Sequence, residues 1–484
     1  MNKKKDYTKI LTIIISTLCF LFFRFIPAPE GLSEVSMQVI GIFIGTMLLW
    51  NFVGTEWTSF LAMILLAVFQ IMSPSEIFSS GFGNSIITFL IAFFMISRTL
   101  SQVGISKRIA IWCISNKFAQ KGPWAFVTMF LFAATFLASF MSQTAALLVF
   151  LPIAEQIFKE LKIEKGNKVA QMIVLGLGFA VGIGSANTPI GHAIILIPLN
   201  FLLRDTGINV NIISFSIFGI ATGMVVFLGM ILMYKLLYKP DLSVFKNFDV
   251  KTLKNEMPSI SKEEKISAAV FISIIFTWIL QSILPNIWPS VGNYLNSLGS
   301  AVPAMIGVVI LSIVSVNGKP VMNYKDAAVN GVPWSGVIFN AAVLVLSGSL
   351  VLEEVGISTF LISTITPLIQ GLQPSIFILV TITLCVILTN VSSNTVCATI
   401  FYTICIPISM AMGNINYVAL ASLIAVASSY AFATPPSTLP MAIVGGSGWV
   451  DIKAMLKYGS LLALIGIIAL CLVGYPIANI IFPY

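Results

Sequence analysis

The chain has 484 residues, of which 58% are hydrophobic and only 9% charged, and its formal net charge is +8. A soluble protein carries about a quarter charged residues, so this composition excludes a soluble globular protein. Many apolar runs reach the roughly 18 residues that span a membrane, and they are continuous rather than alternating, which excludes a β-barrel. Lys and Arg lie in short loops, where they orient helices, so the charge does not indicate nucleic-acid binding. We predict an all-α polytopic membrane protein.

Six predicted helices and one apolar stretch with a polar centre make up the first half of the chain, residues 1–238. Lysines crowd the amino terminus, so we place it in the cytoplasm. The fifth helix is too long for one unbroken crossing at about 1.5 Å per residue, and several glycines and Pro189 break it near its centre. The predicted helices cover residues 8–28, 35–53, 57–73, 79–101, 168–203 and 212–237.

The apolar stretch 123–160 lies between the fourth and fifth helices and has Ser142-Gln143-Thr144 near its middle. Lysines at both ends predict that both ends face the cytoplasm. A re-entrant helical hairpin fits this pattern, and so do two complete crossings, which cation counting does not separate. We prefer the hairpin, because the free backbone groups of a polar tip must be buried in protein or line a cavity.

The only long polar segment, residues 239–266, is predicted as a cytoplasmic linker between the halves. The second half, residues 267–484, repeats the plan of the first and is predicted to end outside. Its hairpin, 373–412, enters from the outer side with Ser393-Asn394-Thr395 at the tip, and a Thr-Pro-Pro string breaks the helix that follows. The predicted helices cover residues 267–289, 299–316, 331–352, 416–450 and 459–482.

The two halves also share residues at equal spacing. Val103-Gly-Ile-Ser106 recurs as Val355-Gly-Ile-Ser358, an offset of 252 residues, against 251 between the two Ser-x-Thr tips. The helix before the first string runs inward and its counterpart runs outward. Inverted repeats with hairpins and broken helices are typical of secondary transporters. We therefore expect about eleven transmembrane helices plus two re-entrant hairpins in two inverted repeats.

The interruptions predict one binding site at the middle of the membrane, built from both halves. Hairpin tips and broken helices leave backbone N–H groups free, and half-helix N-termini add partial positive charge, so the site favours a small anion with two carboxylates. Free carbonyls at the same breaks favour a hard cation such as Na⁺. His192 is the only histidine, and an ionisable residue inside a membrane segment is a functional candidate.

At these residues the chain resembles the divalent anion/sodium symporter family, which has two Ser-Asn-Thr hairpin tips followed by Thr-Pro-rich breaks. The second tip matches, whereas the first has Gln143 in place of Asn, and the first break has His192 where a small residue is common. The resemblance implies a homodimeric elevator-type transporter in the plasma membrane, with scaffold and transport domains. Its substrates would be succinate, malate, fumarate, 2-oxoglutarate or citrate.

The breaks and the resemblance together assign the candidate ligands of substrate and cation. Substrate would meet Ser142, Gln143, Thr144, His192, Ser393, Asn394, Thr395, Thr434 and Pro435. By the resemblance, Na⁺ would meet Gly191 beside the first tip, and Thr389, Ser392, Asn394 and Ala433 beside the second.

The first Na⁺ site departs from the family pattern. Ala138 lacks a side-chain oxygen, Gln143 is longer than Asn, and His192 could bring positive charge where Na⁺ would sit. We therefore hypothesise an exchanger of dicarboxylates. A Na⁺-coupled dicarboxylate or citrate symporter is the alternative, and only the symporter would use Na⁺; no other cofactor is expected.

Three other classes of membrane protein stay open on the sequence. An ion channel rarely needs paired inverted hairpins with matched polar tips. A membrane enzyme lacks support, because the helices hold no Asp or Glu pair and no metal-ligand cluster. A proton-coupled carrier needs an intramembrane carboxylate, for which Glu155 is the candidate. Arg98 is interpreted as a snorkelling anchor and the six cysteines as free thiols.

Overall fold

The computed structural model describes residues 2–245 and 259–482, except 351, 353, 358, 361, 362 and 365–371. The described residues form a helical bundle with one short antiparallel hairpin, β1 (Ser315–Val316) and β2 (Lys319–Pro320). Eight of the described helices are long and apolar enough to cross a membrane, or up to ten if two bent pairs each count as one span. The helical polytopic class is confirmed, and the number of eleven spans stays a prediction.

The first four predicted helices appear in order, with two additional helices, α4 and α6. Pro74 at the first position and a Ser73–Glu76 capping box begin α4, and Gly104, with a φ of +95°, separates α5 from α6. A positive φ is a conformation that favours glycine, and a residue that adopts it ends the preceding helix. These elements are α1 (Asn2–Phe22), α2 (Glu34–Phe52), α3 (Glu56–Val68), α4 (Pro74–Ser80), α5 (Ser85–Gln102) and α6 (Ile105–Ile114).

The predicted first hairpin is a pair of packed helices, α7 (Pro123–Ala138) and α8 (Gln143–Glu160), with its turn at the polar tip. Pro123 begins α7, where its missing N–H costs no hydrogen bond. Ser142 is the N-cap of α8, and its Oγ accepts from the Ala145 N–H at 3.2 Å. The helix–turn–helix is therefore present, and its partial crossing of the membrane stays a prediction.

The long fifth segment is broken as predicted. Its first part, α9 (Lys168–Ala186), ends before the Asn-Thr-Pro string, and the chain resumes in η3 (Ala193–Ile195) and α10 (Leu196–Thr206). Pro189 lacks an N–H and cannot continue the hydrogen-bond ladder of α9. The first half ends with α11 (Ile212–Met233) and the π-turn η4 (Tyr234–Tyr238).

The linker predicted at residues 239–266 ends earlier than expected, because the next helix begins at Lys262. It contains η5 (Ser243–Phe245), and residues 246–258 lie outside the described part of the chain. A Ser261–Glu264 capping box begins the next helix inside the predicted linker. The helices that follow are α13 (Lys262–Ile287), α14 (Pro289–Ser297), α15 (Ala301–Ile313), α16 (Tyr324–Asp326), η6 (Ala327–Gly331) and α17 (Trp334–Leu350).

The second hairpin repeats the form of the first. Its helices are α19 (Pro374–Thr389) and α20 (Asn394–Met412), with the turn at the second polar tip. The helix after it is broken as predicted, between α21 (Tyr417–Ala427) and α22 (Leu439–Gly446), with η7 (Pro435–Ser437) in the break. The chain closes with α23 (Ile452–Ala469), η8 (Leu470–Gly474) and α24 (Tyr475–Ile481).

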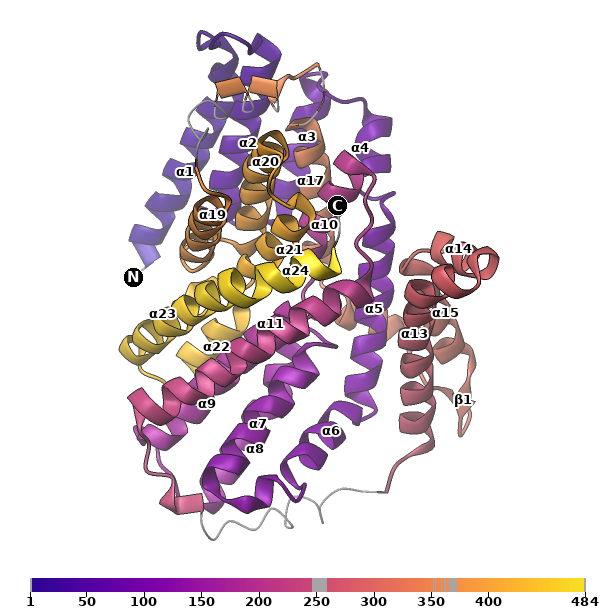
Figure 1. The fold of residues 1–484 in the computed structure, drawn as a ribbon, viewed down its shortest axis with the longest axis vertical. Helices are drawn as coiled ribbons and strands as arrows, with labels where there is room; N and C mark the ends of the chain where they lie inside the picture. Colours follow the sequence, from indigo (N-terminus) through magenta and orange to yellow (C-terminus); the bar gives the residue numbers. More distant parts are fainter. Residues whose placement is uncertain are drawn as a thin grey trace.

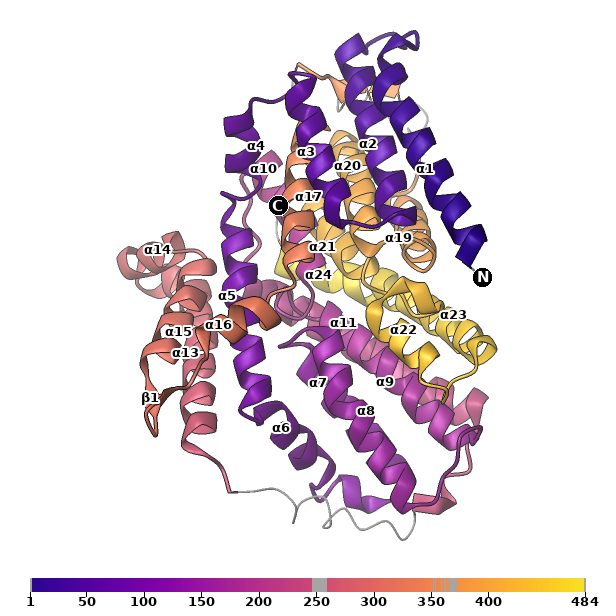
Figure 2. The same ribbon diagram turned by 180° about the vertical axis from the view of Figure 1, so that it is seen from behind.

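The two hairpins lie in different halves of the molecule. Figure 1 shows α7 and α8 in its lower half and α19 and α20 in its upper half, with α11 and α23 passing diagonally between them. Figure 2, from behind, shows the same order, with α13 to α15 along one edge and α1 and α2 at the opposite upper corner. This arrangement brings the hairpin turns toward the middle of the molecule.

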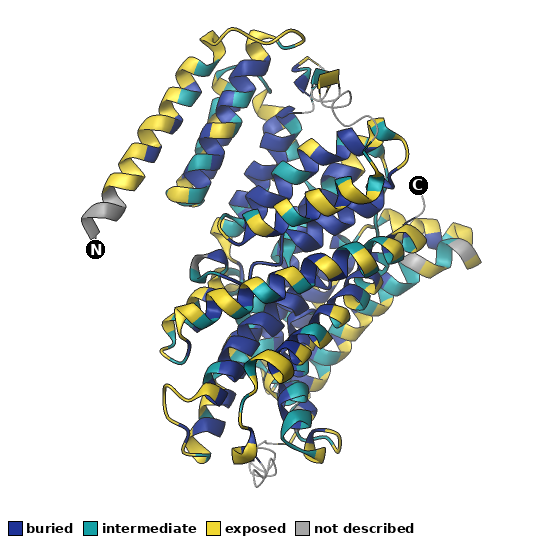
Figure 3. Cartoon of the chain, turned by 60° about the vertical axis from the view of Figure 1, so that its left-hand side comes forward, coloured by how far each residue is buried: buried dark blue, intermediate teal, exposed yellow. Residues whose placement is uncertain are grey.

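Burial separates the helices around the two breaks from the outer ones. In the most apolar window of each helix, 94% of the residues of α9 are buried, against 17% for α1 and 24% for α13. Figure 3 shows the same contrast, with exposed residues along α1 and buried ones through the centre. The outer helices therefore expose the apolar surface that a bilayer would cover.

Two of the smaller sequence interpretations are supported, and Arg98 has a partner that the sequence did not predict. Its Nε lies 3.2 Å from Asp326 Oδ2, and its role as a snorkelling anchor stays a prediction. All six cysteines are free thiols. Gly104 and Gly356, in the repeated Val-Gly-Ile-Ser strings, both have positive φ; Ser358 lies outside the described residues.

Candidate functional site

The turn of the first hairpin is hydrogen-bonded to the break in the next helix. The Thr188 hydroxyl donates to the Ser139 carbonyl, and the Asn187 side-chain amide lies 3.1 Å from Ser139 Oγ. The Gly191 N–H donates to Thr188 Oγ1 at 3.0 Å. These bonds satisfy backbone groups that the broken helix leaves free, and they join hairpin and break into one unit.

Asn390 joins the second hairpin to the second break with both ends of its amide. Its Oδ1 accepts from the N–H groups of Phe432 and Ala433 at 2.8 and 2.7 Å. Its Nδ2 donates to the carbonyls of Val386 and Tyr430 at 2.7 and 2.9 Å. Every hydrogen-bonding position of the amide is used, so this side chain sets the path of the backbone through the break.

The two halves make one contact in the same way. Thr434 donates from Oγ1 to the Asn390 carbonyl at 2.6 Å, as Thr188 does to the Ser139 carbonyl. Each threonine precedes a proline in its break, and Ser139 and Asn390 are 251 residues apart, the offset of the two tips. The sequence likeness between the halves is therefore accompanied by a like contact.

His192 connects the first hairpin to the second broken helix. Its Nε2 lies 3.4 Å from Gln143 Nε2, at the start of α8, and its Nδ1 lies 2.9 Å from Ser429 Oγ, just after α21. Gln143 and His192 belong to the first half of the chain and Ser429 to the second. The imidazole is half-buried, with Gly191 buried beside it.

The neighbours of His192 match a neutral ring with its proton on Nδ1. With the Gln143 amide nitrogen facing the ring, Nε2 is the acceptor of this contact. The Nδ1–H then donates to Ser429, whose own hydroxyl donates to the Ala425 carbonyl at 3.2 Å. No charge on the ring is required to satisfy these groups.

Polar contacts continue from Ser429 to the second tip. The carbonyl of the adjacent Ser428 lies 2.6 Å from Thr389 Oγ1, which in turn lies 2.8 Å from Asn394 Oδ1. A line of polar groups thus runs from Gln143 at one tip, through His192, to Asn394 at the other. These contacts connect the two tips through the centre of the molecule.

Most of the predicted site residues are partly buried. Around the first tip, Ser142, Gln143 and Thr144 are half-buried; around the second, Asn394 and Thr395 are buried and Ser392 and Ser393 half-buried. Ala433 is buried, and Thr434 and Pro435 are half-buried beside it in the second break. The Ser392 Oγ donates to Asn51 Oδ1 on α2 at 2.6 Å, and its role as a Na⁺ ligand stays a prediction.

Sequence reasoning missed four residues of this centre. Ser139 and Asn390 were detectable, because they share the offset of the tips. Ser429 and Asn51 carry no such signal, since their roles arise from segments 237 and 341 residues apart that fold together.

The helices after each break carry glycines where the break passes closest. A Cβ at Gly219 of α11 would lie 2.8 Å from the Asn187 carbonyl carbon, and one at Gly459 of α23 would lie 2.6 Å from Ala433 Cα. Real Cβ atoms do not approach that closely, so only glycine fits. The first break therefore packs directly against α11, and the second against α23.

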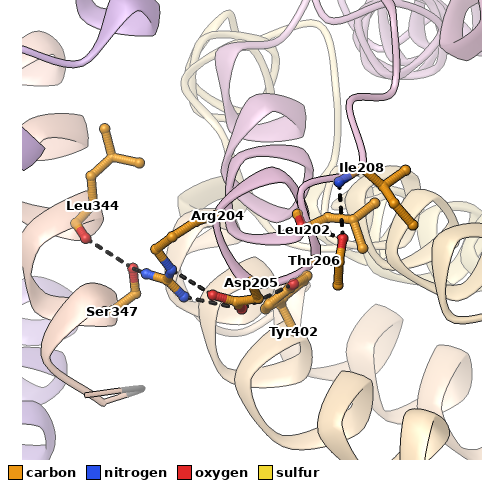
Figure 4. A network of polar contacts seen from close by, with 8 residues as sticks. All are labelled: Leu202, Arg204, Asp205, Thr206, Ile208, Leu344, Ser347 and Tyr402. Atoms are coloured by element: carbon orange, nitrogen blue, oxygen red, sulfur yellow. Dashed lines mark hydrogen bonds and ion pairs between the residues drawn. The ribbon is translucent and has the colours of Figure 1, made fainter. Parts of the chain in front are cut away.

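A charged cluster lies at the far end of α10. Figure 4 shows Arg204 between Asp205 and Ser347, with Tyr402 on the other side of Asp205. Arg204 Nε lies 2.6 Å from Asp205 Oδ1, the Tyr402 hydroxyl donates to Asp205 Oδ2 at 3.1 Å, and Arg204 Nη1 donates to Ser347 Oγ at 3.4 Å. The cluster joins α10 to α20 and touches α17.

The centre contains backbone groups, hydroxyls, amides and one imidazole. Across the part of the chain that the structure describes, no group of three or more His, Cys, Asp or Glu could hold a metal ion. Two hairpins and two broken helices that meet at uncharged polar groups inside an apolar helical bundle are the architecture of a secondary membrane transporter.

Comparison with known proteins agrees with this class. Residues 7–482 match the family described as the sodium:sulfate symporter transmembrane region, and the chain belongs to this family of divalent anion/sodium symporters. The predicted family is confirmed, as is a transporter rather than an enzyme.

Two similar relatives are bacterial proteins named sodium-dependent dicarboxylate transporter SdcS. The one from Staphylococcus saprophyticus is 27% identical over 98% of this chain and 92% of its own length. The one from Staphylococcus aureus is 26% identical over 99% of this chain and 94% of its own.

Two solved transporter structures share the fold at low sequence identity. The YdaH transporter of Alcanivorax borkumensis has a TM-score of 0.56 and 12% identity over 98% of this chain and 97% of its own. MtrF of Neisseria gonorrhoeae has a TM-score of 0.57 and 14% identity over 97% of this chain and 94% of its own.

Proposed function

We propose that this protein is a secondary active transporter of small dicarboxylate anions such as succinate, malate, fumarate and 2-oxoglutarate. The observation that carries the proposal is the line of uncharged polar groups from Gln143 through His192 to Asn394. It supplies donors from both halves of the chain for the two ends of one substrate. The names of the staphylococcal relatives support the same substrate class.

Each hairpin tip would hold one carboxylate. The tips begin α8 and α20, and the N-terminus of a helix attracts an anion through its free N–H groups and its dipole. At the second tip, Ser393 is the N-cap but makes no side-chain capping bond, so the first N–H groups of α20 are not covered by that hydroxyl. Ser142, Gln143, Thr144, Ser393, Asn394 and Thr395 would be the direct ligands, with Thr434 and Pro435 beside them.

The hairpins and broken helices would move together as the transport block, defined as α7–α10 and α19–α22, against a scaffold of α1–α5 and α13–α17. The bonds of Thr188 and Asn390 support this, because they tie each hairpin to its break. The scaffold would also form a homodimer in the plasma membrane, with the amino terminus in the cytoplasm and the carboxyl terminus outside. This arrangement is an elevator with two inverted repeats.

Exchange of one dicarboxylate for another is the coupling that we propose. The His192 ring lies next to Gly191, at the first expected Na⁺ site, and bonds to Gln143 there. An empty site would leave its donors unpaired inside the membrane. Burial of each unpaired polar group costs on the order of several kcal/mol. Bound substrate removes that cost on either side, so loaded carriers would cross and empty ones would not.

Sodium symport is the second candidate. The staphylococcal relatives are named sodium-dependent. At the second tip, Thr389 Oγ1 lies 2.8 Å from Asn394 Oδ1 and 2.6 Å from the Ser428 carbonyl oxygen, and oxygen atoms are the ligands that hard cations prefer.

Uptake measurements in proteoliposomes distinguish exchange from sodium symport. Purified protein is reconstituted with or without internal succinate, and uptake of radiolabelled succinate is followed with and without an inward Na⁺ gradient. Exchange predicts uptake that requires internal succinate and is unchanged by Na⁺. Uptake into empty vesicles that follows the Na⁺ gradient would establish symport and reject exchange. No uptake of succinate, malate, fumarate or 2-oxoglutarate under any condition would reject the substrate class.

A further inference from the structure

The last turn of α2 is bonded to the turn of the second hairpin. Asn51 Oδ1 accepts from the Ser392 hydroxyl at 2.6 Å and from the Ser393 backbone N–H at 3.1 Å. The neighbouring Trp50 is buried and packs edge-on against Phe339 of α17, with ring centroids 4.7 Å apart. The end of α2 is therefore held by the scaffold while its amide reaches the tip.

The orientation of the Asn51 amide is determined by its partners. Its Nδ2 donates to the Met47 carbonyl at 2.8 Å, and a carbonyl only accepts. The Ser393 N–H only donates, so the atom that faces it must be the oxygen. Asn51 thus presents an acceptor oxygen to the N–H and hydroxyl at the second tip.

That oxygen accepts from Ser393, one of the residues that the proposed function assigns to a substrate carboxylate. We propose that Asn51 is a positioning residue that takes the place of the carboxylate in the empty carrier and holds the second tip to α2. The inference rests on the proposed function, because it requires the second tip to bind substrate. A carboxylate accepts roughly twice as strongly as a neutral amide, so bound substrate would displace Asn51.

Displacement of Asn51 by substrate would make movement of the transport block depend on whether substrate is bound. Without substrate, Asn51 ties the transport block to the scaffold and the block stays in place. With substrate, the Ser392 hydroxyl and the Ser393 N–H turn to the carboxylate, and this tie to α2 is lost. Exchange requires that the empty carrier stay in place, and this contact would hinder its movement.

Two substitutions at Asn51 have opposite predicted effects. Asn51→Ala removes the acceptor, so efflux of radiolabelled succinate into substrate-free medium should rise about five- to tenfold relative to exchange, the weight of one or two hydrogen bonds. Asn51→Asp offers the tip a carboxylate of its own, so exchange should slow and its KM should rise. Asn340→Ala is the matched control, because Asn340 of α17 donates to the Gly336 carbonyl of its own helix at 2.7 Å.

A crosslinking measurement reads the contact without transport. In an Asn51→Cys/Ser392→Cys double variant, oxidation in membranes should join the two positions, and added succinate should slow the reaction. The single variants give the background from the native cysteines.

The outcomes distinguish this inference from the proposed function. Higher empty efflux in Asn51→Ala, with normal efflux in Asn340→Ala and crosslinking slowed by succinate, supports the inference. An unchanged ratio of efflux to exchange in Asn51→Ala, or crosslinking indifferent to succinate, overturns it while wild-type transport leaves the proposed function intact. Absence of dicarboxylate transport in the wild type would overturn the proposed function, and this inference with it.

Discussion

Gln143 and Ser429 come from opposite halves of the chain, and the imidazole of His192 connects them, with Nε2 3.4 Å from the Gln143 amide and Nδ1 2.9 Å from Ser429 Oγ. The ring thus joins the first hairpin to the second break. Its loss should therefore affect substrate binding more than folding.

We expect His192→Ala to raise the KM for succinate about three- to tenfold, because each lost hydrogen bond contributes about 0.5–1.5 kcal/mol. His192→Gln, which keeps a donor and an acceptor, should restore part of the affinity. Ser409→Ala is the control, since Ser409 bonds only within α20 to the Ile406 carbonyl in the contacts described. Equal KM values for wild type and His192→Ala, at equal protein levels, would make the ring a packing residue.

Asn390→Ala should destabilise the second break. The substitution leaves the Phe432 and Ala433 N–H groups without their acceptor. A buried polar group left unsatisfied costs about 1–3 kcal/mol, so the loss of acceptor for both groups should lower the free energy of unfolding by about 2–6 kcal/mol. Thermal unfolding in detergent measures this. A variant as stable as the wild type would show that the break is held by packing alone.

Gly219→Ala should be poorly tolerated, because its Cβ would meet the backbone of Asn187, which cannot withdraw as a flexible side chain can. Overpacking of this kind costs about 1–3 kcal/mol. Gly446→Ala is the matched control: Gly446 ends α22, and a Cβ there would meet nothing within 4 Å. Its stability should change by less than about 1 kcal/mol. Similar melting of both variants would contradict the close approach.

The ion pair between Arg108 of α6 and Glu264 of α13 tests how these two helices are joined. Arg108 Nη2 lies 2.8 Å from Glu264 Oε2, and the Glu264 side chain is only 5% exposed. Glu264→Ala should lower the free energy of unfolding by about 3–5 kcal/mol, because it strands a partly buried charge.

Arg24 and Glu34 provide the comparison for that pair. They are 3.8 Å apart, and the Glu34 side chain is 79% exposed. Exposed pairs contribute about 0–1 kcal/mol, so Glu34→Ala should melt almost as the wild type does. The prediction fails if the two glutamate variants lose equal stability.

The sequence by itself determined the membrane class, the positions of the hairpin turns and both helix breaks. These features depend on local chemistry: an apolar run long enough for a bilayer, a proline that cannot donate, and a polar string that cannot face lipid. The helices α4, α6 and α14 were missed, because they are short and their signals lie in a few residues at their ends.

Only the tertiary structure decided which distant side chains meet. The sequence offered no partner for Arg98, which bonds to Asp326, 228 residues later in the chain. Ser429, just after α21, contacts His192, and Asn51 of α2 contacts Ser392 at the second tip. The partners are too far apart in sequence for a local pattern to predict these contacts. Hydrogen bonds depend on positions within a few tenths of an ångström, and the packing of many helices sets those positions together.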